Sequence, residues 1–267
     1  MTIAQLSMAN ETSWQPEADV RRKLLELAEI MHQCIQRGCA RIEAVLPGGL
    51  DVPRRAPKLL AKVAAIQKSG QGNIRLWPML YAIAVGEENA SGSRIVAAPT
   101  NGAAGVIPSV LECWRETCDD DDIVDFLLTA AAIGMIHKTN APIAGTETGC
   151  QGGIDVACSM AAGGVCALMG GSPEQIEDAA KIAMERQLGF TCDPVTGLSQ
   201  VPCIERNGIA AEEAIKSAQL AYLEDGRNKI PLDRIVATMC AAGKDRMGKY
   251  KETSLGGLAL MAGKTEC

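Results

Sequence analysis

Three cysteines lie at predicted bends of the chain within residues 145–208. Cys150 occurs in T-G-C-Q-G-G, Cys192 in T-C-D-P, and Cys203 follows a proline in V-P-C-I-E. Glycine, proline and aspartate at these places predict turns in which backbone groups are exposed. The cysteine spacing does not match that of zinc fingers. Thiolates on three separate loops favour an iron–sulfur cluster, which needs ligands spread around a cuboid several ångströms wide.

Three protein thiolates would leave one iron of a four-iron cluster without a protein ligand. An open iron is a Lewis acid that can bind a hydroxyl oxygen and make it a better leaving group. Backbone N–H groups of glycine-rich turns and helix N-termini also favour a net-negative cluster. The pattern therefore indicates a cluster that takes part in chemistry on a small substrate.

Other cysteines of the chain are better explained by packing. Cys158 and Cys166 fall two turns apart on one predicted helix, about 12 Å from each other, which is too far to share one metal ion. Cys34, Cys39 and His32 lie on or near an earlier predicted helix and fit core or surface positions better than ligand positions. A free cysteine often behaves as a small buried hydrophobe.

The bulk composition narrows the class of protein. The 267 residues are 47% hydrophobic but only 3% aromatic, which favours closely packed helices. A net charge of −6 without a basic block argues against nucleic acid as a partner. No apolar run reaches the roughly 18 uncharged residues of a membrane span, and the first residues do not resemble a signal peptide. We therefore expect a cytoplasmic protein whose 11 cysteines are free thiols plus a metal site.

Hydrophobic periodicity predicts an all-α fold, a compact helical domain whose cysteine-bearing loops surround the cluster site. We expect one domain over residues 1–267. Besides a helical run within 145–208, helices are predicted over residues 20–45, 58–68, 76–89, 103–111, 123–138, 209–222 and 231–247.

Several polar segments have two interpretations each. Thr100, Asn101 and Gly102 precede a predicted helix, so they form either a small-anion site or an ordinary N-cap with a glycine turn. Arg54 and Arg55 would meet a substrate carboxylate or a partner chain, although a solvated turn is the default interpretation.

Acidic residues near helix ends also call for explanation. Residues 119–122 are four aspartates, which we interpret as a solvated helix cap. Glu87 and Glu88 lie near the C-terminus of a predicted helix, where acids oppose the helix dipole, so another interaction is needed to account for them.

Six segments carry a resemblance to a known family. They are R-R-A-P (54–57), E-E-N-A (87–90), V-A-A-P-T-N-G-A-A-G-V-I-P (96–108), G-T-E-T-G-C-Q-G (145–152), L-G-F-T-C-D-P-V-T-G-L-S-Q-V-P-C-I-E-R-N (188–207) and G-K-D-R-M-G-K-Y-K-E-T-S-L-G-G-L-A (243–259). Together they resemble the catalytic, or alpha, part of the iron–sulfur-dependent L-serine dehydratases over nearly the whole chain.

The resemblance implies an all-helical lyase that converts L-serine to pyruvate and ammonia with a 4Fe–4S cluster. It implies that Cys150, Cys192 and Cys203 are the cluster ligands. We expect the turn at 100–102 to hold the substrate carboxylate and Glu147 to pair with its ammonium group. Further polar contacts would come from Lys244, Lys249 and Arg206, which otherwise are helix-end or surface charges. No residue stands out as the general base.

The chain departs from the family pattern in two places. The family usually has G-C-Q-G-E, whereas Gly153 stands here in place of the glutamate, with Asp155 two residues on as a substitute acid. The S-S-S-H-T motif of the beta domain of single-chain relatives is absent, so we expect a separate beta subunit or a stand-alone variant, in a homo- or hetero-oligomer. The terminal Cys267 fits either a displaceable cap on the open iron or a disordered terminal thiol.

Three alternatives stay open. An iron–sulfur cysteine desulfidase or related amino-acid lyase would differ only in substrate. A pyridoxal-phosphate dehydratase would need a phosphate cup, for which Gly170-Gly171-Ser172 is a weak candidate, because it fits an ordinary loop and N-cap before Pro173. A metal-stabilised helical scaffold or regulatory subunit would hold zinc and have no activity of its own.

Overall fold

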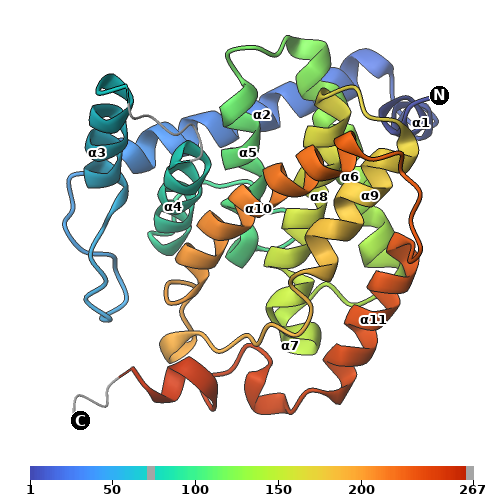
Figure 1. Ribbon diagram of the computed structural model, residues 1–267. Helices are drawn as coiled ribbons and strands as arrows, with labels where there is room; N and C mark the ends of the chain where they lie inside the picture. Colours follow the sequence, from blue (N-terminus) through green and yellow to red (C-terminus); the bar gives the residue numbers. More distant parts are fainter. Residues whose placement is uncertain (71–75, 263–267) are drawn as a thin grey trace.

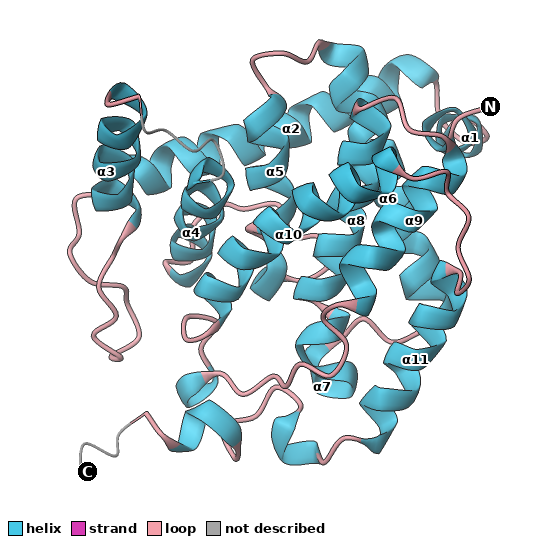
Figure 2. Cartoon of the chain, viewed as in Figure 1, coloured by secondary structure: helices cyan, strands magenta, loops and turns pink. Residues whose placement is uncertain are grey.

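The computed structural model describes residues 1–70 and 76–262, and these residues fold into helices joined by turns (Figures 1 and 2). The prediction of an all-α fold is confirmed: no strand occurs in this part of the chain, where the β-type pairs are isolated bridges between Val45 and Pro53 and between Cys192 and Lys251. None of its helices is long and apolar enough to cross a membrane.

The α-helices follow one another along the chain with short 3₁₀ turns between some of them. Their bounds are α1 Ile3–Glu11, α2 Glu17–Ala40, α3 Ala56–Lys68, α4 Leu76–Ala90, α5 Val106–Trp114, α6 Asp120–Asn140, α7 Gly145–Thr148, α8 Ile154–Leu168, α9 Pro173–Glu185, α10 Cys203–Leu223 and α11 Leu232–Asp245.

Helix α8 forms the centre of the fold, with α6, α9 and α10 packed around it (Figure 1). Every residue from Ile154 to Cys166 is buried. Small residues make this close packing possible: a Cβ at Gly164 would lie 2.7 Å from the ring of Phe126 on α6. Cys158 and Cys166 are fully buried in this core, as their helical spacing predicted.

Helix boundaries differ from the predictions at three places. Helix α2 ends at Ala40 because Arg41 has extended backbone angles, and residues 41–55 then form an irregular segment, here called the arm, that leads to α3. Helix α5 begins at Val106, after a separate 3₁₀ turn over 101–103. Helix α10 begins at Cys203, several residues before the predicted start, so Cys203 lies at a helix N-terminus and not on a loop.

Two predicted N-caps are confirmed. Asp119 caps α6 and forms a capping box with Asp122, so the aspartate run satisfies the free N–H groups at the helix start. Ser172 caps α9 in the same way with Gln175. The segment before Pro173 is therefore an ordinary helix start.

Arg54 is 5% exposed, so its predicted place on a solvated turn is wrong. Its guanidinium lies 3.9 Å from the carboxylate of Glu87 and 3.7 Å from that of Glu88. The Glu87 carboxylate also accepts the backbone N–H groups of Arg55 and Ala56 at 2.7 and 3.2 Å, where α3 begins. These contacts explain why two acids at a helix C-terminus are tolerated, because they bind the arm and α3 and do not face solvent.

The arm in turn supports the chain around Cys203. The Gln200 side-chain amide donates a 2.6 Å hydrogen bond to the carbonyl of Pro47. Gly48, with φ 109°, approaches Leu198 so closely that a Cβ would lie 2.7 Å from its side chain. Buried charges on α4 thus position a segment that leads directly into the cysteine-bearing helix.

A Glu87→Ala variant is expected to lose about 3 kcal/mol of unfolding free energy. It leaves the buried Arg54 guanidinium with one acidic neighbour fewer and the N–H groups at the start of α3 without an acceptor. Urea unfolding of Glu87→Ala and of Glu43→Ala measures this. Glu43 is a half-exposed acid on the same arm, and its removal should cost less than about 1 kcal/mol. Equal losses in the two variants would contradict this role of Glu87.

Candidate active site

A cavity of about 170 Å³ brings the three cysteines together. Residues from four separate segments of the chain, 100–102, 144–154, 192–203 and Glu252, form its walls, and Cys150, Cys192 and Cys203 are buried there. The lining residues are Thr100, Gly102, Ala144, Gly145, Gly149, Cys150, Gly153, Ile154, Cys192, Pro194, Ser199, Cys203 and Glu252. Distant parts of the sequence therefore meet at one thiol-rich cavity.

Each cysteine is held by a different kind of local structure. Cys150 lies in a 3₁₀ turn, residues 149–152, next to Gly149 at φ 76°. A Cβ on Gly149 would collide with the guanidinium of Arg246, so only glycine fits there. Cys192 has an extended backbone whose N–H and carbonyl pair with residues 250 and 252 of the C-terminal segment, at 2.9 and 2.7 Å. Cys203 opens α10.

Two arginines connect the turn around Cys150 to the segment that precedes Cys192. The Arg206 guanidinium on α10 donates to Cys150 Sγ at 3.0 Å and to the carbonyl of Thr191 at 2.6 Å. The Arg246 guanidinium, just after α11, donates to the carbonyls of Thr148 and Phe190 at 2.9 and 2.5 Å. The position of one cysteine relative to another is therefore fixed by charged donors.

The thiols differ in acidity. The pKa of Cys150 is lowered to about 7, because a hydrogen bond from Cys192 and then the nearby Arg206 outweigh the opposing effect of burial. The same hydrogen bond and burial raise the pKa of Cys192. Burial raises the pKa of Cys203 to about 12. One thiolate thus forms readily, and the other two would lose their protons on binding a metal centre.

The donor set fits a cluster with three protein ligands. Three buried thiols face one cavity from three elements, and a cationic N–H donor contacts one of the sulfurs. Across residues 1–70 and 76–262, no three His, Cys, Asp or Glu side chains are arranged to hold a single metal ion. A cuboid cluster requires its thiolates to stand further apart than ligands of one ion.

The predicted carboxylate site is only partly at the cavity. Thr100 and Gly102 line it, whereas Asn101 is exposed and lies outside its walls. Thr100 precedes the 3₁₀ turn over 101–103, but its hydroxyl makes no capping hydrogen bond there. The Thr100 hydroxyl is therefore not engaged as an ordinary N-cap.

Other predicted contacts lie away from the cavity. Glu147, on α7, is exposed and does not line it. Lys244 and Lys249 are also exposed. Their roles toward a substrate stay predictions. Cys267 lies outside the described residues, so its role as a cap also stays a prediction.

Neither histidine lines the cavity. His137 is fully buried on α6, where its Nε2 lies 3.1 Å from the hydroxyl of Ser159, and burial lowers its pKa to about 4. His32 lies beside a different cavity. The imidazoles are therefore not placed to exchange protons with a molecule among the cysteines.

Two polar residues of the cavity, Glu252 and Ser199, were not singled out from the sequence. Glu252 has φ 55°, and its carboxylate lies so near Gly145 that a Cβ there would be 2.8 Å from it. Ser199 forms a hydrogen bond with Cys203 that lowers the pKa of this thiol against the effect of burial. Both belong to segments that carry the family resemblance, 243–259 and 188–207, and this was the available signal.

Gly153, where the chain departs from its family pattern, is part of the cavity wall, whereas Asp155, the suggested substitute acid, is not. Gly153 lines the cavity, and a Cβ there would approach the Thr100 hydroxyl to 3.0 Å. Asp155 is fully buried on the first turn of α8, and neither of its carboxyl oxygens has a hydrogen-bond partner. Burial, and then the charge of Cys150, raise the pKa of Asp155 well above its usual value.

Asp155 should therefore make the metal-free chain less stable as pH rises. The unfolded carboxyl ionises near its ordinary pKa, whereas the folded one keeps its proton, so unfolding releases a proton at neutral pH and stability falls with pH. Asp155→Asn removes this pH-dependent contribution to the free energy of unfolding. Urea unfolding at about pH 5 and about pH 8 should show the variant gaining stability relative to the parent at the higher pH. A constant difference at both values would contradict the raised pKa.

The chain is thus a helical protein with a thiol-lined site. Three buried cysteines, a cationic donor and several polar groups surround one small cavity. Residues 1–259 match the family model described as serine dehydratase alpha chain, and the chain belongs to this family.

Curated relatives share nearly the whole of this chain. The L-serine dehydratase of Streptomyces coelicolor is 50% identical over 263 residues, covering 97% of this chain and 57% of the relative. The L-serine dehydratase of Mycobacterium bovis is 48% identical over 267 residues, and L-serine dehydratase TdcG of Escherichia coli is 46% identical over 265 residues. The chain covers 58% of the length of each of these two.

Proposed function

We propose that this chain is the catalytic part of an L-serine dehydratase, a carbon–oxygen lyase that converts L-serine to pyruvate and ammonia. The observation that carries the proposal is the convergence of Cys150, Cys192 and Cys203 on one cavity that also has polar walls. Membership of the serine dehydratase alpha chain family and the printed names of the relatives support it.

The three cysteines would hold a 4Fe–4S cluster. When bound, such a cluster supplies a Lewis-acidic iron without a protein ligand, which suits the loss of a hydroxyl group. Arg206 would then hydrogen-bond to a ligand sulfur and hold the Cys150 turn in place. The buried position of the thiols would shield the site from water.

The opposite walls would bind the amino acid. The Thr100 hydroxyl and the backbone at Gly102 would receive the carboxylate, since both line the cavity. Glu252 is exposed and also lines the cavity, so it would pair with the ammonium group where the cavity meets solvent. The geometry favours Glu252 over Glu147 for this role, since Glu147 is outside the cavity walls.

Anaerobic reconstitution with iron and sulfide, followed by measurement of pyruvate from L-serine, tests the proposal. We expect pyruvate and ammonia in equal amounts. Formation of sulfide from L-cysteine with no turnover of L-serine would instead support a desulfidase. Zinc in place of iron, without acid-labile sulfide, would support the scaffold or regulatory role.

A beta part is the proposed partner, in a homo- or hetero-oligomer. The chain covers less than two thirds of the length of these relatives. The reconstituted chain should be assayed alone and together with a beta part from a relative. Activity only in the mixture would identify the beta part as a required partner.

A further inference from the structure

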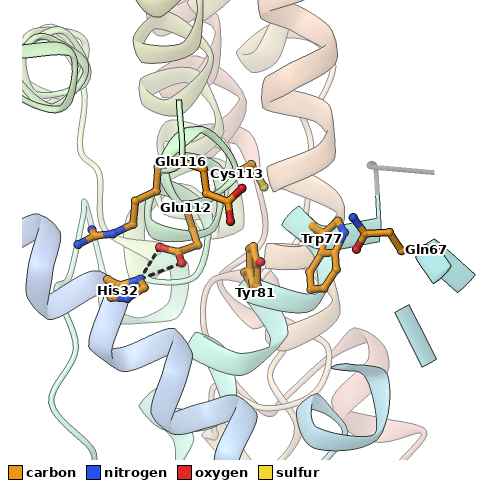
Figure 3. Close-up of a pocket in the computed structure, with 8 residues that line it drawn as sticks. His32, Gln67, Trp77, Tyr81, Glu112, Cys113 and Glu116 are labelled. Atoms are coloured by element: carbon orange, nitrogen blue, oxygen red, sulfur yellow. Dashed lines mark hydrogen bonds and ion pairs between the residues drawn. The ribbon is translucent and has the colours of Figure 1, made fainter. Parts of the chain in front are cut away.

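A second and larger cavity, of about 580 Å³, is lined by residues of α2, α4 and α5 and lies apart from Cys150, Cys192 and Cys203 (Figure 3). Its walls share no residue with the cavity around Cys150. The residues that matter for its chemistry are His32 from α2, Trp77 and Tyr81 from α4, Glu112 from α5 and Glu116 just beyond it.

One wall of this cavity is aromatic. Trp77 and Tyr81 are four residues apart on α4 and so share a helix face. Their ring centroids are 5.5 Å apart at an interplanar angle of 36°, which makes one continuous apolar surface. With only three tryptophans and three tyrosines in 267 residues, an aromatic pair at the wall of a cavity is unusual for this chain.

The facing wall is acidic. Both oxygens of Glu112 lie 2.8 Å from Nδ1 of His32, whose Nε2 lies 2.7 Å from the side-chain amide of Gln36. This network fixes the Glu112 carboxylate beside the cavity, as Figure 3 shows. Glu116 extends toward Tyr81 in the same view and has no ion pair with any residue that the structure describes.

The arginine of this cavity is not paired with either of its two glutamates. Arg115 donates to the carboxylate of Glu29 at 2.7 Å and is thereby paired with an acid on α2 that is not part of the cavity wall. Burial raises the pKa of Tyr81, and negative charge on its neighbours, Glu112 among them, raises it further. The cavity therefore combines two acidic side chains with one aromatic wall.

We propose that this cavity binds a small organic cation, whose ammonium group lies toward Glu112 and Glu116 and whose hydrocarbon part lies on Trp77 and Tyr81. A cation over an aromatic face is attracted by the ring quadrupole, and a half-buried carboxylate adds a charge partner. An anion would be repelled by the two acids. A metal ion would find no ligands on the aromatic wall, and a neutral apolar molecule would bury the carboxylates without compensation.

The test compares choline with 3,3-dimethylbutan-1-ol, which has the same shape with a carbon atom in place of the charged nitrogen. Each molecule is titrated into the full chain by isothermal titration calorimetry. Choline should bind saturably to one site, and the affinity for the neutral alcohol should be lower by a factor of roughly ten or more. Tryptophan fluorescence should change on addition of choline, because Trp77 is in the wall. Equal binding of the two molecules, or saturation by neither, would overturn the proposal.

Matched variants locate the site. Glu116→Gln and Trp77→Leu should each weaken choline binding several-fold. Glu224→Gln and Trp14→Leu change an exposed acid and a 72% exposed tryptophan outside the cavity and should leave binding unchanged. Glu116 is exposed, so its variant should fold, as circular dichroism can verify. If neither Glu116→Gln nor Trp77→Leu changed choline binding, any choline site would lie elsewhere and the assignment would be contradicted.

Discussion

A Cys192→Ala variant, reconstituted anaerobically, is expected to lose its acid-labile sulfide and its broad absorption near 400 nm, and to form pyruvate no faster than the chain without a cluster. The buried Cys192 is hydrogen-bonded to Cys150 and lines the same cavity as Cys203. Removing one of three thiolates would leave two ligands for the proposed cluster, in which one iron would already lack a protein ligand. The same losses are expected for Cys150→Ala and Cys203→Ala.

Cys118→Ala is the matched control, because Cys118 is a half-buried cysteine in the turn between α5 and α6 that does not line the cavity. It should keep the iron, sulfide and activity of the parent. A Cys192→Ala variant with full cluster content would contradict the ligand set, whereas cluster loss in Cys118→Ala would show that the losses reflect general instability.

The second large effect is expected at Arg206. Arg206→Met removes the donor to Cys150 Sγ and to the carbonyl of Thr191, and also the cation 3.5 Å from Asp193. Groups that orient metal ligands typically contribute 10–100-fold to metal affinity or activity. We therefore expect a roughly 10–100-fold loss of activity per reconstituted chain, together with faster cluster loss on exposure to a chelator.

Two variants complete this experiment. Arg206→Lys keeps the charge but loses the paired donors of the guanidinium, so an intermediate loss is expected. Arg227→Met changes an arginine whose side chain is 89% exposed and should behave like the parent. Arg206→Met with the parent's activity and cluster lifetime would show that the contact with Cys150 is not needed.

The helical fold was predictable because apolar residues recur at helical spacing in a chain with few aromatic residues. The residue at which α10 begins was not predictable. Pro202 indicated a turn around Cys203, whereas it in fact directly precedes the first helical residue. A proline next to a helix start is compatible with either structure, so local sequence did not decide between them.

The partners of the buried charged residues could not be predicted from the sequence either. The sequence indicated that Glu87 and Glu88 needed another interaction, but their partners, Arg54 and Arg41, lie more than 30 residues away on another segment. For the same reason Arg54 was expected on a solvated turn. Side-chain partners that are distant in sequence follow from packing, which a single sequence does not reveal.

The thiol cavity was predictable in part. The three cysteines and Thr100 were identified from their positions beside turns and from the family resemblance, and they line one cavity. Glu252 was not identified, because it reaches the cavity only through the backbone pairing of its segment with Cys192. The prediction that residues 1–267 form a single domain has not been tested.

The most direct measurement for the central proposal is iron and acid-labile sulfide per chain after anaerobic reconstitution, with L-serine turnover followed in the same sample. We predict about four irons and four sulfides per chain, together with pyruvate formation once any required beta part is supplied. Zinc without acid-labile sulfide, or full activity in a sample that contains neither iron nor sulfide, would contradict it.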